Sequence, residues 1–492
     1  MKRIFLVSLL IALTVNAQKN QDSIKTFKKR VLDNIEIDLI TSYYGQNGSN
    51  AAVTGGIGDE ELTDLVTNIS VSIPLGADNV LSIDATVSAY SSASSSNLNP
   101  FSGASTGGED DDDDDDKYKG FPGDDDDGEG GSGQISGSPW VASSGASKSD
   151  VWANFNLSYV HSSDDRNKIY TLHFGVANEF DYFSLGGGVG FTHLFNKKNT
   201  EISLSSTVYL DQWHPQYPTE IKTYFKNNGN LNADYFEGVS ILDALGNPTD
   251  KNSANTWRPV SDGLIQDKGR NTYALSLGFS QILTPKLQMA LFSDITYQEG
   301  WLANPMQRVY FADKPDYYIG NPDNIPNYTS KSNRNTFQLA DDFERLPDTR
   351  FKIPVGMRMH YYINEIFVVR AYYRYYYDDW GINSHTLSVE IPVKITDKFT
   401  LYPAYRYYNQ TAAEYFAPYE THLTSQEFYT SDFDLSEYSA DQYGLGVKYT
   451  DIFTKIKMWK LGIKSIHLDY KHYERSTGLT ANIISLGVKL QM

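Results

Sequence analysis

Apolar and polar side chains alternate along most of this chain. The pattern is clear at residues 81–89, 287–297, 385–395 and 484–492, where every second side chain is apolar and those between are mostly polar. A period of two predicts β-strands with one apolar and one polar face. These segments run about 10–13 residues, the length of a tilted transmembrane strand and roughly twice that of a strand in a soluble sandwich. The pattern therefore predicts an all-β protein with membrane-spanning strands.

The connections between these segments are alternately short and long. Tight turns are predicted near residues 76–79, 162–167, 196–199, 284–286, 363–365 and 396–398, and long polar segments at residues 46–64, 91–148, 213–269, 301–349 and 412–438. Outer-membrane barrels have short periplasmic turns and long extracellular loops. The fold predicted is therefore a transmembrane antiparallel up-and-down β-barrel in the bacterial outer membrane, surrounded by outer-membrane lipid.

Sixteen strands account for the pattern. They are predicted at residues 35–43, 65–75, 79–90, 149–161, 168–180, 183–195, 199–212, 270–283, 287–300, 350–362, 366–378, 383–395, 399–411, 439–449, 461–474 and 480–492. An even number places both ends of the barrel in the periplasm. Fourteen strands is the alternative, because the pattern is weakest in the first two strands and around residues 450–460.

The N-terminus has the features of a secretory signal peptide. Lys2 and Arg3 precede an apolar run, residues 4–15, and Ala17 offers a small residue for cleavage. We expect residues 1–17 to be removed, residues 18–34 to form a short periplasmic arm, and residues 35–492 to form the barrel.

Composition excludes several classes of function. The 61 acidic and 42 basic residues leave a net charge of −19, which argues against nucleic-acid binding. The absence of cysteine excludes disulfides, thiol catalysis and a lipoprotein anchor. No histidine lies in a zinc-protease or serine-hydrolase motif. Outer-membrane hydrolases pair histidine with Ser or Asp, so His173 and His360, expected in the lumen, are the places to look for such a site. We expect the protein not to be an enzyme.

An acidic block lies in the predicted extracellular loop 91–148. Residues 110–116 and 124–127 are consecutive aspartates flanked by Gly and Ser. Such a segment buries little apolar surface, so we expect it to be disordered. Clustered carboxylates suit Ca²⁺, although no EF-hand spacing is present. Loosely held Ca²⁺ is therefore the one metal hypothesis, with these candidate ligands: Asp110, Asp112, Asp114, Asp116, Asp124 and Asp126. We expect no other cofactor.

Charged side chains on the polar strand faces are expected to line the lumen. Acidic residues dominate the first half of the barrel and basic residues the second, which predicts an acidic wall opposite a basic wall. The principal lumen-lining candidates are Asp84, Glu179, Asp294, Arg358, Arg370, Arg374, Glu390, Arg406, Lys448 and Lys471. An open lumen with such walls would pass polar solutes. A lumen closed by ion pairs or by an infolded loop would instead indicate a scaffold.

Two further patterns concern local structure. Trp213, Trp301 and Trp380 each follow a strand that ends at the long-loop side, and we interpret them as part of an outer aromatic girdle. The glycine-rich stretch 186–190 lacks the Lys and Ser or Thr of a phosphate-binding loop. Glycines within a strand more often mark a bend or close packing.

Several stretches together resemble an uncharacterised outer-membrane barrel family, the domain of unknown function thirty-five-seventy. They are residues 40–44 (ITSYY), 53–60 (VTGGIGDE), the Asp-rich loop, 208–213 (VYLDQW) and 372–376 (YYRYY). The resemblance covers nearly the whole mature chain, and the signal peptide ending NAQ resembles those of Bacteroidota. The family carries no established catalytic residues. Some of its members are encoded near thioredoxin-like and flavin-transferase genes, which implies a link to a periplasmic or surface redox pathway.

These observations predict a passive channel for polar or charged solutes. The alternative is a structural or partner-binding barrel of a larger surface or redox-linked assembly, with a protein partner on loops 213–269 and 301–349. A barrel hydrolase is a third, less favoured hypothesis. The state of the lumen distinguishes the first two.

Overall fold

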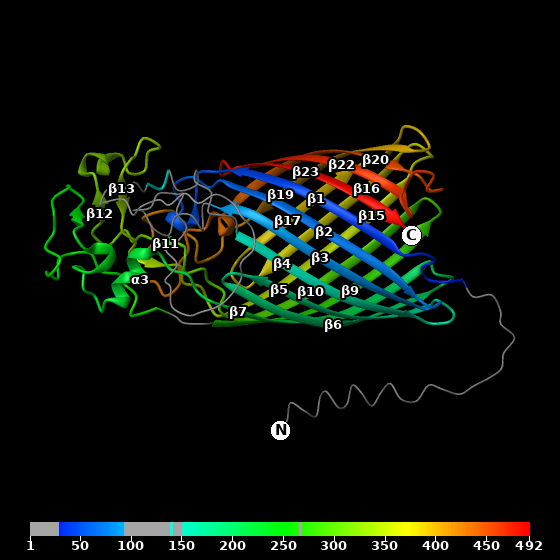
Figure 1. Cartoon of the computed structure of the whole chain (residues 1–492), viewed down its shortest axis with the longest axis horizontal. Coiled ribbons are helices and arrows are strands. Elements are labelled where there is room, and N and C mark those ends of the chain that lie inside the picture. Colours follow the sequence, from blue (N-terminus) through cyan, green and yellow to red (C-terminus); the bar gives the residue numbers. More distant parts are fainter. Residues whose placement is uncertain (1–28, 93–137, 141–149, 265–267) are drawn as a thin grey trace, which may run out of the picture.

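The computed structural model describes residues 29–92, 138–140, 150–264 and 268–492, and in them sixteen long antiparallel strands form a closed barrel (Figure 1). The strands are β1 (Glu36–Asn47), β2 (Leu62–Leu75), β3 (Asn79–Ser92), β4 (Asp150–Ser162), β5 (Lys168–Glu179), β6 (Tyr182–Phe195), β7 (Thr200–Trp213), β9 (Lys268–Thr284), β10 (Leu287–Gly300), β15 (Thr349–Tyr362), β16 (Val368–Asp378), β17 (Asn383–Glu390), β19 (Phe399–Gln410), β20 (Tyr438–Thr450), β22 (Leu461–Arg475) and β23 (Thr480–Gln491). β1 pairs with β23 and closes the wall. The predicted all-β barrel of sixteen strands is confirmed, and the fourteen-stranded alternative is wrong.

Two boundaries differ from the prediction for local reasons. The first hairpin is longer than expected, because β1 and β2 stay paired up to Gln46 and Leu62. The strand predicted at residues 383–395 is interrupted, since Pro392 has no N–H to donate to the ladder. The pairing resumes in the short β18 (Val393–Lys394), and the equally short β21 (Lys457–Met458) adds to the wall before β22.

The alternation of side chains gives the wall an apolar outer face and a polar lumen face. Directly paired residues share a face, so the register assigns each position. On the outer face large apolar side chains are exposed, among them Leu65, Leu172, Val189, Leu277, Val355 and Leu445. Serine, threonine and asparagine recur on the other face, as in the pairs Ser42–Ser485, Asn68–Thr86 and Ser72–Ser82.

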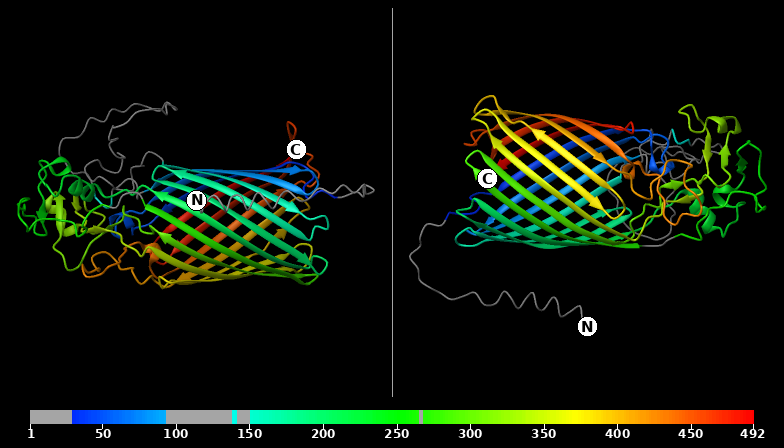
Figure 2. Two further views of the ribbon diagram at one scale, coloured as in Figure 1. Left: turned by 90° about the horizontal axis from the view of Figure 1, so that it is seen from below. Right: turned by 180° about the vertical axis from the view of Figure 1, so that it is seen from behind.

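The long loops pack together beyond one end of the barrel (Figures 1 and 2). We call residues 48–61, 214–264, 301–348 and 411–437 the head. Its small elements are α3 (Thr219–Lys226), a sheet of β8 (Leu242–Asp243), β12 (Tyr317–Gly320) and β13 (Thr336–Gln338), and the pair β11 (Arg308–Val309) and β14 (Asp342–Phe343). Short turns and both ends of the described chain lie at the opposite end of the barrel.

The head has a hydrophobic core of its own. Buried side chains from residues 214–264 and 301–348 form it: Tyr217, Ile221, Leu231, Phe236, Ile241, Trp257, Tyr310, Ile319, Phe337, Leu339, Ala340 and Phe343. Trp257 is fully buried, and its indole N–H donates to the Ala340 carbonyl. Loops 213–269 and 301–349, predicted to bind a partner, therefore bind each other. Their binding of another protein stays a prediction.

The glycine-rich stretch 186–190 is a site of close packing within β6. A Cβ at Gly188, on the lumen face, would touch the His173 ring and would lie 2.5 Å from the Ser206 carbonyl oxygen. Gly187 faces outward, and its nearest such neighbour is the His173 carbonyl oxygen at 3.4 Å. The stretch thus lets the wall accept inward-pointing rings.

This packing predicts a position-specific effect of substitution. Gly188→Ala is expected to destabilise the barrel by about 1–3 kcal/mol, the usual cost of overpacking, whereas Gly187→Ala is the matched control with little effect. The midpoint of urea unfolding in lipid vesicles, followed by the gel shift between folded and unfolded barrel, measures the difference. Equal midpoints for the two variants would contradict this account.

Candidate functional site

Two rows of side chains cross one part of the lumen wall. The first row, read from β15 to β22, is Arg358, Tyr372, Ser388, Arg406, Gln442 and Tyr473. The second row, next to it, is His360, Arg370, Glu390, Ala404, Gly444 and Lys471. Because paired residues project to the same face, four cationic side chains and one carboxylate converge here from five strands. We call these two rows the basic stripe.

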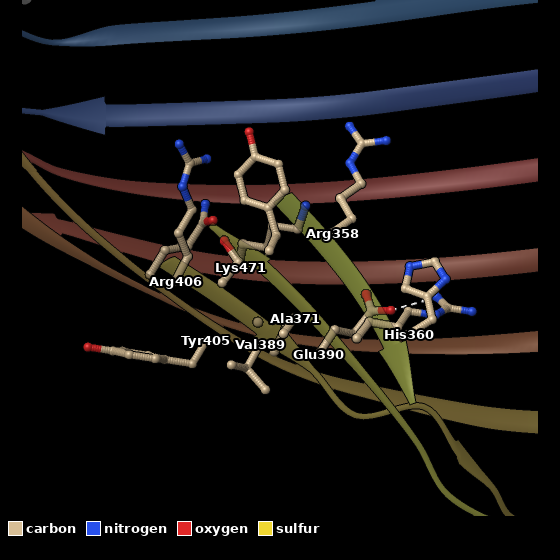
Figure 3. Close-up of a pocket in the computed structure, with 14 residues that line it drawn as sticks. Arg358, His360, Ala371, Val389, Glu390, Tyr405, Arg406 and Lys471 are labelled. Carbon is tan, nitrogen blue, oxygen red and sulfur yellow. Dashed lines mark hydrogen bonds and ion pairs between the residues drawn. The ribbon is translucent and has the colours of Figure 1, made fainter. Parts of the chain in front are cut away.

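The basic stripe lines a cavity of about 340 Å³. Figure 3 shows Arg358 and Arg406 reaching away from the wall, while Val389 and Tyr405 lie on its other side. Arg370 forms an ion pair with Glu390 at 2.7 Å, the only one in the stripe among the described residues. The Arg358 guanidinium lies over the Phe292 ring, 5.1 Å from its centroid. Arg406 and Lys471 have no ion-pair partner in the described part of the chain.

A second cavity, of about 410 Å³, lies on the long-loop side of the stripe. Arg374 lines it, and the buried Nε of this side chain has no hydrogen-bond partner among the described residues. Arg475 lies over the Tyr438 ring and pairs with Asp434 of the head at 2.8 Å. In the structure as described, the walls of both cavities consist of strand residues and the β22–β23 turn, and no head residue enters either.

The register places all ten predicted lumen-lining residues on the lumen face. Arg358, Arg370, Glu390, Arg406 and Lys471 meet in the basic stripe, and Arg374 lies in the neighbouring cavity. Four do not join them: Asp84 pairs across strands with Ser70 and Asn156, Asp294 with Ser276, Lys448 with Thr400 and His467, and Glu179 lies at the long-loop end of β5. These four residues lie on strands far from the basic stripe or at other positions along the barrel axis. The sequence pattern did not predict a role for Phe292, Ala404 or Gly444, because the role of each residue depends on side chains of the neighbouring strands.

The acidic wall stays a prediction, because Asp84, Glu179 and Asp294 form no ion pair with a described residue, whereas some other lumen acids of the first half have basic neighbours. Closure of the barrel puts Glu36 of β1 within 2.7 Å of Lys464 and 2.8 Å of Lys489. Asp211 is similarly held by Arg270 at 2.7 Å. These acids are thus neutralised by neighbouring cations, whereas Arg406 and Lys471 of the basic stripe have no ion-pair partner among the described residues.

The three tryptophans assigned to an outer girdle lie instead in the mouth of the barrel, where they line a cavity of about 320 Å³ between wall and head. Trp380 is only 3% exposed; its N–H donates to the Thr349 carbonyl, and the Arg350 guanidinium lies 4.2 Å from its ring centroid. Arg270 lies over Trp213 in the same way. The girdle interpretation is therefore wrong for these residues.

Carboxyl groups gather where the head meets the wall. Burial raises the pKa of Glu344 to about 8, and the nearby Asp432 adds to the rise. Burial likewise raises the pKa of Glu60 to about 7 and the pKa of Asp432 above its usual range. Glu344 accepts the backbone N–H of Asn304, and Asp432 accepts the side-chain amide of Gln307. Both hydrogen bonds lie within the head, and in both the acceptor is a carboxyl group with a raised pKa.

The lumen histidines lack the partners of a hydrolase site among the described residues. His173 Nε2 lies 3.4 Å from Thr207 Oγ1, and neither His173 nor His360 has a hydrogen bond to a described Ser or Asp. No group of three or more described His, Asp or Glu side chains is placed to hold a metal ion. The six candidate Ca²⁺ ligands, the signal peptide and most of loop 91–148 lie outside the described residues, so the Ca²⁺ hypothesis stays a prediction.

Comparisons with known proteins identify one family. A model of the family described as "Protein of unknown function (DUF3570)" matches residues 6–484. That description names no organism, so a Bacteroidota source stays a prediction. No curated protein matches the chain. None of the described helices is long and apolar enough to span a membrane.

Solved structures with a similar course of the chain include three membrane proteins. OccK1 (OpdK) of Pseudomonas aeruginosa is 9% identical, with a TM-score of 0.33 over 93% of this chain and 98% of that chain. The toluene transporter TodX of Pseudomonas putida is 10% identical, with a TM-score of 0.33 over 94% and 90%. A bacterial polysaccharide outer-membrane secretin is 7% identical, with a TM-score of 0.38 over 93% and 98%. At TM-scores below 0.5, these likenesses support no transfer of a solute or a role to this chain.

Proposed function

The chain belongs to the DUF3570 family of proteins of unknown function, and from the geometry of its lumen we propose that it is an outer-membrane channel for small polar or charged solutes that favours anions. The observation that carries this proposal is the basic stripe. Arg406 and Lys471 face a cavity, and neither side chain has an ion-pair partner among the described residues. No described part of the head fills that cavity. A wall meant only as a scaffold has no need of such side chains.

The outer face of the wall supports a place in a membrane. Large exposed apolar side chains cover this face. Their exposure is unfavourable in water and favourable in contact with lipid. Tyrosines near its long-loop end hydrogen-bond to polar groups of the rim, as Tyr273 does with Glu299 and Tyr405 with Asp441. Aromatic rings also pack together near the short turns, where the ring centroids of Phe399 and Tyr449 are 5.3 Å apart. Such belts are typical of membrane interfaces. The outer membrane is the bilayer in which strands of this kind occur.

Ion selectivity in planar bilayers tests the proposal. We expect residues 18–492 to give steady conductance in KCl, with a reversal potential that shows chloride preferred to potassium. Replacing Arg358, Arg406 and Lys471 together by Gln is expected to lower the chloride-to-potassium permeability ratio roughly fivefold or more, since one charge about 4 Å from an ion in water contributes about 1 kcal/mol. Low salt is needed, because the screening length is about 10 Å at 0.1 M.

A control with the same change in net charge separates local from global effects. Lys197, Lys198 and Lys398 are exposed in short turns, and their triple Gln variant is expected to keep the selectivity of the unsubstituted protein. Absence of conductance from a barrel that runs as folded on a gel would contradict the channel. The partner-binding alternative, with the head as its surface, would then be favoured, and capture of a periplasmic or surface redox protein would be its first test.

A further inference from the structure

A niche interrupts the basic stripe at Ala404 and Gly444. These two small residues are the successive members of the second row between Glu390 and Lys471. Neighbouring strands are about 4.8 Å apart, so roughly 14 Å of wall between Glu390 and Lys471 carries only a methyl group and a hydrogen. A Cβ at Gly444 would lie 3.4 Å from Lys471 Cγ and 3.5 Å from Ala404 Cβ. The floor of the niche is therefore small and apolar.

Cationic groups border the niche on two sides. Lys471 follows it in the same row, and Arg406 lies in the next row between Ser388 and Gln442. Glu390, at the far end of the same row, is neutralised by Arg370 at 2.7 Å. The next row toward the short turns consists of Tyr402, Gly446 and Asp469, whose side chain lies beside Gly446. The niche thus combines two available positive charges, neighbouring hydroxyl and amide groups, and an apolar floor. An inorganic anion would use the charges but not the floor.

We propose that the niche is a binding subsite for a small organic carboxylate in transit through the lumen. The carboxylate group lies between Arg406 and Lys471, where a guanidinium can donate two parallel N–H bonds to its two oxygens. The short carbon chain lies over Ala404 and Gly444. Ser388 and Gln442, on either side of Arg406, donate hydrogen bonds to the carboxylate oxygens. This inference rests on the proposed channel and specifies the class of solute that the channel holds.

Binding of butyrate to the purified protein in detergent tests the subsite without requiring conductance. Saturation-transfer NMR detects such weak binding, and titration gives the affinity. Ala404→Leu fills the niche and leaves every charge in place, so we expect it to weaken butyrate binding by about tenfold or more, a loss of about 1.4 kcal/mol, with chloride preference in bilayers retained. Arg406→Gln with Lys471→Gln is expected to reduce both binding and chloride preference.

The same substitution on the outer face is the matched control. Ala85 on β3 shares the outward face with its cross-strand partners Ile69 and Phe155, so Ala85→Leu is expected to leave butyrate binding unchanged. Equal binding of butyrate by Ala404→Leu and the unsubstituted protein would overturn the subsite, as would competition by chloride or phosphate as strong as that by acetate. A conducting, anion-selective channel that does not bind butyrate would overturn the subsite alone, whereas a barrel without conductance would overturn the channel.

Discussion

Replacement of Arg308 by Met is expected to unfold the head and to leave the barrel wall closed. The Arg308 side chain is fully buried. It donates from Nε to Glu220 Oε1 at 2.7 Å, from Nη2 to Glu220 Oε2 at 3.1 Å, and from Nη1 to the Val53 carbonyl at 2.9 Å. One side chain thus connects three of the four loops that make up the head.

The expected loss is large because Glu220 would remain buried without its partner. Removing one partner of a buried ion pair typically lowers the free energy of unfolding by about 3–5 kcal/mol, whereas replacing both partners by apolar groups often changes it little. Limited proteolysis should therefore cut Arg308→Met rapidly within residues 214–264 and 301–348, while the gel shift of the folded barrel persists. Arg308→Met with Glu220→Leu should recover much of the resistance. Arg334→Met, at an exposed position in the same loop, is the control. Cleavage of Arg308→Met at the control rate would contradict the role assigned to this pair.

The stability of the head is expected to fall as the pH rises from about 5 to about 8. Glu344 has a pKa of about 8 in the folded head, but releases its proton near its ordinary pKa of 4.5 when the head is unfolded. A carboxyl group whose folded pKa is raised stabilises the fold at low pH, and that contribution is lost as the pH rises through the folded value. A pKa difference of one between the folded and unfolded states corresponds to about 1.4 kcal/mol, so the loss is on the order of a few kcal/mol.

Glu344→Gln should flatten this dependence. The amide oxygen of Gln can still accept the Asn304 N–H, and it carries no charge at any pH in the range. The dependence should persist in part, because Glu60 and Asp432 also have raised pKa values. Proteolytic resistance of the head, measured from pH 5 to 8 with a protease active throughout, provides the readout. Glu237→Gln, at an exposed carboxylate of the head, should keep the full slope. A stability that rises with pH in the unsubstituted protein would show that the sign is wrong.

Local periodicity accounts for what could be predicted from the sequence. A period of two is a property of each strand alone, so the barrel strands and the lumen face of Arg358, Arg406 and Lys471 followed from it. The ion pair between Glu36 and Lys489 across the seam did not follow from it, because that contact depends on the register between the first and last strands. The head core did not either, since Arg308 and Glu220 are 88 residues apart. For Trp213 a signal was present: it has the same parity as Asp211, which indicates the lumen side and not the lipid side.

The head also sets an order on the assembly of the protein. Its core contains the Val53 backbone from the first long loop, and residues near Tyr429 from the last long loop form bridges with the segment 308–345. These contacts join parts of the chain that are synthesised far apart, and contacts of such separation form late. The head is therefore complete only after the strands that carry its first and last loops have been brought together. A compact head therefore indicates that the barrel strands have already paired, and solvent-accessible core residues of the head would indicate an incompletely folded barrel.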